Sequence, residues 1–129
     1  MKRIAFAIAL GLAAGAAAAD PAVGVWQTAP DDNGNFGHVE VTACGAALCG
    51  TLVRAYDASG REIASPNVGR QIVRDMAPRG GGEYAGGKVY SPDRDKTYNG
   101  RLTLTERGLA VEGCVMGICR DGGTWRRVN

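Results

Sequence analysis

The protein has 129 residues, 15 of them basic and 13 acidic, and a formal net charge of +2. A chain of this length predicts one domain. The segment 1–19 has a short basic start, Lys2 and Arg3, then an apolar run that ends in small residues before Asp20, which is typical of a secretory signal peptide. Without this segment the chain has 13 basic and 13 acidic residues, so its charge gives no support for binding nucleic acid.

No segment after residue 19 is apolar enough to span a bilayer, so we expect no stable membrane insertion. The signal peptide predicts a periplasmic or secreted protein, with residues 20–129 forming a single domain.

Four cysteines form two C-x4-C pairs, Cys44 with Cys49 and Cys114 with Cys119. An even number of cysteines in an exported chain predicts disulfides, and four cysteines allow three connectivities. We expect the local pairing, because each pair brackets four residues between strand-like runs, and facing residues of a hairpin lie within reach of a disulfide. The alternatives are a long-range pairing, which chain entropy favours, and a four-cysteine zinc site.

Short runs of alternating apolar and polar residues dominate the chain after the signal peptide. Val39, Val41 and Ala43 share one face of their run, and Leu102 and Leu104 share one face of another. This period of two is typical of half-buried antiparallel strands. Taken in order, the strands are expected at residues 23–28, 37–44, 49–56, 70–75, 83–90, 97–105, 109–115 and 119–128.

The segments between the predicted strands are rich in glycine, proline and polar residues. Residues 57–69 are expected to form a long polar loop, and residues 78–82, with one proline and three glycines, should break the chain between two strands. Regularly spaced short strands with short turns favour an up-and-down barrel, which leaves no exposed sheet edge. The predicted fold class is therefore all-β: a small antiparallel barrel of about eight strands.

Several motifs resemble those of a family of secreted bacterial proteins known as domain of unknown function 2147. The motifs are Gly24-Val25-Trp26, Cys44-Gly45-x-x-Leu48-Cys49-Gly50, Gly87-Lys88-Val89-Tyr90-Ser91-Pro92, Gly117-x-Cys119-Arg120 and Thr124-Trp125-x-Arg127. The resemblance covers essentially all of the chain after the signal peptide. One motif departs from the family, which usually has Asn-Pro-Asp where this chain has Ser65-Pro66-Asn67.

The family is also similar to the calycins, the lipocalin-like barrels. That resemblance implies that Trp26 closes one end of the barrel and that Arg127 of the last strand packs on it. An eight-stranded barrel holds only side chains or one small ligand. We expect a small apolar or amphipathic ligand, with Trp26, Tyr56, Tyr84, Tyr90 and Arg127 as the candidate binding residues, because tyrosine suits the mouth of a pocket.

The alternative function is a solid-core envelope module that binds a protein partner, as yet unknown, through the loop 57–69. We predict no catalytic residues, metal site or cofactor. His38 is the only histidine, on the polar face of its run, and a calcium loop starting at Asp31 would have Phe36 and Thr42 where glycine and glutamate are required. The chain is therefore not expected to be an enzyme.

Overall fold

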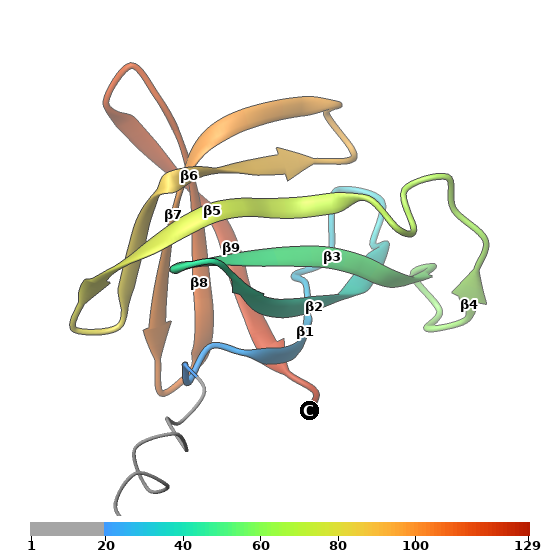
Figure 1. The fold of residues 1–129 in the computed structure, drawn as a ribbon. Coiled ribbons are helices and arrows are strands. Elements are labelled where there is room, and N and C mark those ends of the chain that lie inside the picture. The colour runs from blue at the N-terminus through green and yellow to red at the C-terminus, as the bar shows by residue number, and fades with distance from the viewer. Residues whose placement is uncertain (1–19) are drawn as a thin grey trace, which may run out of the picture.

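A computed structural model describes residues 20–129, all of whose regular secondary structure is β (Figure 1). The predicted signal peptide lies outside the described residues. The strands are β1 (Gly24–Gln27), β2 (Phe36–Cys44), β3 (Ala47–Tyr56), β4 (Glu62–Ile63), β5 (Gln71–Gly80), β6 (Glu83–Ser91), β7 (Lys96–Thr105), β8 (Gly108–Val115) and β9 (Ile118–Arg127). No helix in this part of the chain is long and apolar enough to cross a membrane.

Eight of the strands close into an antiparallel barrel. Their order is β2-β1-β9-β8-β7-β6-β5-β3, and pairing between β2 and β3 completes the ring. Every strand except the short β4 therefore lies between its neighbours in sequence, which confirms the predicted up-and-down barrel. The ninth strand, β4, lies in the segment expected to be a loop and pairs with the end of β3, beyond the part of β3 that pairs with β5.

The expected break at residues 78–82 is wrong in part. Strand β5 continues through Pro78, which pairs with Tyr84, and the turn falls at Gly81 and Gly82, both with positive φ. Proline is tolerated here because the pairing of β5 with β3 ends at Met76, so β5 has a free edge beyond that residue. A proline on a free edge costs no hydrogen bond of the ladder.

Both disulfides have the local pairing that the sequence predicts. Cys44–Cys49 joins the ends of β2 and β3, with 5.7 Å between the Cα atoms, and Cys114–Cys119 joins a directly facing pair of β8 and β9. The four sulfurs thus lie on two separate hairpins rather than around one point, as a zinc site would require. Two disulfides are typical of a protein from an oxidising compartment.

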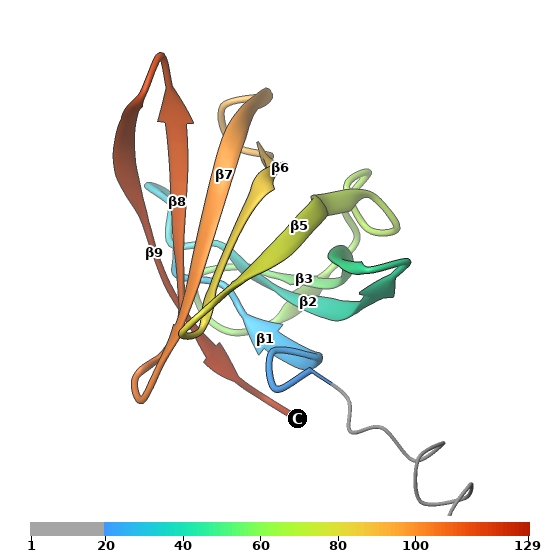
Figure 2. The ribbon, with the colours of Figure 1, turned by 60° about the vertical axis from the view of Figure 1, so that its left-hand side comes forward.

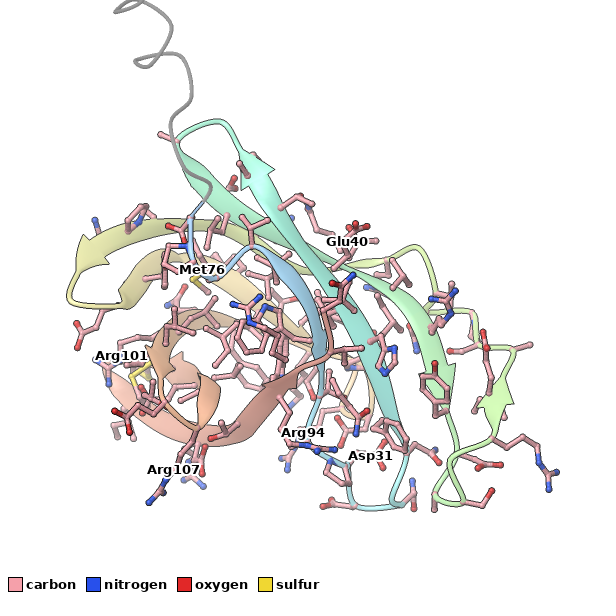
Figure 3. All side chains as sticks on the ribbon, turned by 90° about the horizontal axis from the view of Figure 1, so that it is seen from below. Asp31, Glu40, Met76, Arg94, Arg101 and Arg107 are labelled. Atoms are coloured by element: carbon pink, nitrogen blue, oxygen red, sulfur yellow. A yellow bond between two sulfur atoms is a disulfide. The ribbon has the colours of Figure 1, made fainter. Side chains whose placement is uncertain are left out.

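The barrel interior is filled by side chains from all eight strands. Figure 3, which looks along the barrel, shows Met76 within the ring of strands and Glu40 and Arg101 outside it. No polar or charged side chain of residues 20–129 is buried. The largest side chains that are less than 2% exposed are Trp26, Met76, Leu102, Leu109, Val39, Val41 and Val73.

Glycines occupy inward positions where an added side chain would crowd the core. A Cβ atom on Gly100 would lie 2.2 Å from Cε of Met76 and 2.4 Å from Cγ2 of Val89. One on Gly50 would lie 2.9 Å from Cγ1 of Val39. The glycines therefore mark places where the core approaches the strand backbone, and they indicate a packed centre rather than a chamber.

Candidate functional site

Trp26 of β1 and Arg127 of β9 close one end of the barrel, which we call the base. The two residues face each other across the ladder, and the Arg127 guanidinium lies 4.3 Å from the centre of the indole ring. The indole Nε1 donates a hydrogen bond to the carbonyl of Ala22, 2.9 Å away, and Arg127 donates to the carbonyls of Pro21 and Val23. The predicted packing of Arg127 on Trp26 is confirmed, and the pair ties the first residues of the barrel domain to its last strand.

Tyr84 lies at the same end of the barrel. Its ring is buried, and its hydroxyl donates a hydrogen bond to a carboxylate oxygen of Asp20, which also accepts one from the amide of Ala22. Burial first, and then the contact with Asp20, raise the pKa of the Tyr84 phenol well above its usual range. Tyr84 therefore remains a neutral hydrogen-bond donor that holds the N-terminal residues of the domain against the base.

Tyr90 lies at the other end of β6. Its ring belongs to the hydrophobic core, the Arg70 guanidinium lies 3.6 Å from the ring centre, and its hydroxyl donates to Asp95 at 2.8 Å. The hydrogen bond to Asp95 is the main cause of a raised pKa for the Tyr90 phenol. Tyr90 thus joins the segment before β5 to the turn between β6 and β7.

Tyr56 packs beside His38 and Phe36 on the neighbouring strand β2. Its ring stacks on Phe36 with 5.0 Å between ring centres, and its hydroxyl lies 3.4 Å from Nδ1 of His38. The other imidazole nitrogen lies 3.3 Å from the side-chain oxygen of Gln27. The sequence places His38 on the polar face of its strand, but these neighbours leave it half-buried.

We expect the protein to lose stability as His38 becomes protonated. Burial, and then repulsion from Arg54, lower the pKa of His38 from its ordinary 6.5, while Glu62 acts in the opposite direction. Below pH 6.5 the unfolded chain therefore binds more protons than the folded one, and the free energy of unfolding falls as pH drops toward the folded pKa. Urea unfolding at about pH 7.5 and pH 5.5 measures this loss.

The variant His38→Gln is the control for that experiment, because glutamine keeps hydrogen-bonding capacity but does not titrate. Its free energy of unfolding should fall less than that of the wild type between the two pH values. An equal fall in both proteins would assign the pH dependence to other groups.

The structure does not bring the five predicted binding residues around one cavity. Trp26, Tyr84 and Arg127 meet at the base, Tyr90 lies near the opposite end, and Tyr56 packs on Phe36. Three of the five stabilise the closure of the barrel through contacts with residues 20–23. Their role in ligand binding remains a prediction.

Two open depressions lie beside the turn between β7 and β8 and share Thr105, Glu106 and Arg107. The first has a volume of about 340 Å³ and is lined by Pro21, Trp26, Leu104, Thr105, Glu106, Arg107, Gly108 and Arg127. The second has a volume of about 490 Å³ and is lined by Thr105, Glu106, Arg107, Ala110 and Thr124.

The first depression combines apolar walls with two exposed guanidinium groups. Pro21, Trp26 and Leu104 supply apolar surface, while Arg107 and Arg127 supply two positive charges against the one negative charge of Glu106. The sequence predicts Trp26 and Arg127 as binding residues, whereas residues 106–108 only separate two predicted strands. A binding role for Arg107 could not be predicted from the sequence. Its position beside Arg127 depends on how the barrel closes.

The ring of eight strands is closed, and Trp26 and Arg127 cover its base. The fold therefore belongs to the class of lipocalin-like β-barrels. Protein HP1028 from the human pathogen Helicobacter pylori, which belongs to the lipocalin family, has a similar structure, with a TM-score of 0.66 and 20% sequence identity; the match covers 84% of this chain and 83% of that chain. Residues 24–127 match the family described as "Uncharacterized protein conserved in bacteria (DUF2147)", and the chain belongs to this family. No curated protein matches the chain.

Proposed function

We propose that the protein is an exported binding protein, in the periplasm or outside the cell, for small amphipathic molecules that carry an anionic group. The observation that supports this role is the first depression at the base, where Arg107 and Arg127 lie beside apolar surface. Guanidinium groups bind carboxylates and phosphates through paired hydrogen bonds. The anionic group would bind the arginines, and the apolar part would lie along Leu104 and Pro21.

The packed interior favours a ligand at the surface over one enclosed in the barrel. Inward side chains fill the ring, and a Cβ atom added at Gly50 or Gly100 would crowd the side chains of the core. We propose binding without catalysis, because the single histidine contacts an amide and a phenol, which do not form a catalytic pair with it.

Dodecanoate is a suitable probe, because it combines a carboxylate with an apolar chain. Dodecanoate should raise the melting temperature of the protein, while dodecyltrimethylammonium, with the same chain length and the opposite charge, should not. The variant Arg107→Gln should bind dodecanoate about tenfold more weakly, the expected cost of one charged hydrogen bond.

Arg94→Gln is the matched control, because Arg94 is another exposed turn arginine, between β6 and β7, at the end of the barrel away from the base. It should bind dodecanoate as the wild type does. Native mass spectrometry after gentle purification provides a second measurement. A bare chain in that spectrum, together with no thermal stabilisation by dodecanoate, would overturn the proposal.

The second candidate function is binding of a protein partner through the segment 57–69. A filled core is also compatible with this function, which needs no internal cavity. The segment 57–69 carries β4 on the end of β3, and a carboxylate oxygen of Asp57 accepts hydrogen bonds from Ser59 and Arg61. An ordered polar segment can present a fixed surface to a partner. Replacing residues 59–68 with a short glycine-serine turn should then abolish crosslinking to a partner in intact cells while leaving the barrel folded.

A further inference from the structure

The tip of the β8–β9 hairpin is the most exposed apolar feature of the described chain. Val115, Met116 and Ile118 are 53%, 93% and 67% exposed. The other large exposed apolar residues, Ile63, Val68 and Val128, are not next to one another in sequence. Figures 1 and 2 show this hairpin extending beyond the rest of the barrel, at the end of β8 opposite the depressions. We propose that this tip inserts into the interfacial region of a lipid bilayer.

The tip is apolar on both faces. Val115 and Ile118 face each other across the ladder and share one face, and the Cys114–Cys119 disulfide lies on the other. Met116 occupies the turn between them. The disulfide holds the two strands together directly behind the turn, so the hairpin needs little ordering when it enters the bilayer.

Charges near the tip fit an anionic lipid surface. Arg120 follows Ile118 by two residues on the same face, about 7 Å back along the strand. The first acidic pair, Glu112 and Asp121, lies one step further back and on the opposite face. Interfacial segments bury their apolar surface about 5–10 Å deep and attract anionic lipids through basic residues. Arg120 is therefore placed to contact headgroups while Met116 and Ile118 reach the acyl chains.

The size of the tip favours a bilayer over a protein partner. Three side chains on a two-stranded hairpin fall far short of the roughly 800 Å² per partner that a stable protein interface buries. A bilayer needs only apolar surface that enters it, and the backbone of Val115 and Ile118 is already paired within the hairpin. The proposed contact is weak, reversible and peripheral, and it leaves the proposed ligand site at the base free.

Tryptophan fluorescence provides the test. The natural tryptophans are buried, at 1% and 4% exposure, so a change in the emission of a Met116→Trp variant when vesicles are added will report mainly on the tip. The protein is purified from the periplasm of an expression host, and mass spectrometry verifies that residues 1–19 are absent, since that apolar segment would itself bind lipid. Vesicles of phosphatidylglycerol and phosphatidylcholine should shift the Met116→Trp emission to shorter wavelength.

The β2–β3 hairpin supplies the matched control, because it also ends in a disulfide but has only glycine and alanine in its turn. Ala46→Trp should show no shift with the same vesicles. In flotation experiments the double variant Met116→Asp, Ile118→Asp should bind vesicles at least tenfold more weakly than the wild type. Aspartate tolerates the positive φ of Met116, so this variant should fold, and circular dichroism verifies that it does.

Arg120→Gln should weaken flotation only with vesicles that contain phosphatidylglycerol. Equal flotation of the wild type and the double variant would overturn the proposal. So would no flotation of the wild type with vesicles that contain phosphatidylglycerol or with vesicles that lack it. So would a dimer of the wild type, seen by sedimentation, that the double variant does not form, because the tip would then bind a second copy.

Discussion

The variant Gly87→Ala is expected to lose about 3 kcal/mol of unfolding free energy, at the upper end of the usual cost of overpacking. A Cβ atom on Gly87 would lie 1.9 Å from the carbonyl oxygen of Arg74 and 2.6 Å from the carbonyl carbon of Asp75. Both are backbone atoms of β5, which cannot move away without breaking its pairing with β6. Urea unfolding, followed by tryptophan fluorescence, measures the loss.

Gly100→Ala is the matched control, because Gly100 is a buried barrel glycine that pairs directly with Gly87. Its Cβ would meet side-chain atoms of Met76 and Val89 rather than backbone atoms, and the flexible Met76 side chain can move. We expect a smaller loss, about 1 kcal/mol. If alanine at Gly87 costs no more than alanine at Gly100, the close approach of β5 to β6 at this point is not a constraint on the fold.

Trp26→Ala is expected to destabilise the barrel by about 3–5 kcal/mol, because it removes the largest fully buried side chain. The substitution also leaves the Ala22 carbonyl without the indole donor and removes the ring on which Arg127 lies. Residues 20–23 would then lose part of their attachment to the base. Thermal or urea unfolding measures the effect.

Two milder variants divide this loss into its parts. Trp26→Phe keeps most of the packing and removes the hydrogen bond to Ala22, at a cost of about 1–2 kcal/mol. Arg127→Ala removes only the contacts of the guanidinium group with the outer face of Trp26 and with the carbonyls of Pro21 and Val23. We expect it to lower the free energy of unfolding by about 1 kcal/mol. The prediction fails if Trp26→Ala lowers the free energy of unfolding by no more than either of these two variants does.

The alternation of apolar residues predicts the eight barrel strands and part of the core. Val39 and Val41 are fully buried, as their shared face predicts, and so is Leu102. Ala43, assigned to the same face as the valines, is exposed. A period of two identifies the face of a strand but not the point where the strand passes beyond the barrel, because that point depends on the neighbouring strands.

Other features depend on long-range register and were not visible in the sequence. Register shifts between β3 and β5 and between β6 and β7 let the ring close, and they fall at residues such as Gly50 and Gly87. The same long-range packing determines that the interior is solid, a property that strand count alone leaves open. The depression beside Arg107 likewise arises only when β9 closes against β1.

The spacing of the cysteines has a consequence for how the two disulfides form. Each bridge joins cysteines five residues apart, so the correct partner is always the nearest thiol along the chain. Short loops close at a lower entropic cost than long ones, and random collisions therefore favour the native connectivity. We therefore expect each bridge to form once its own hairpin has folded, without exchange of mispaired bonds.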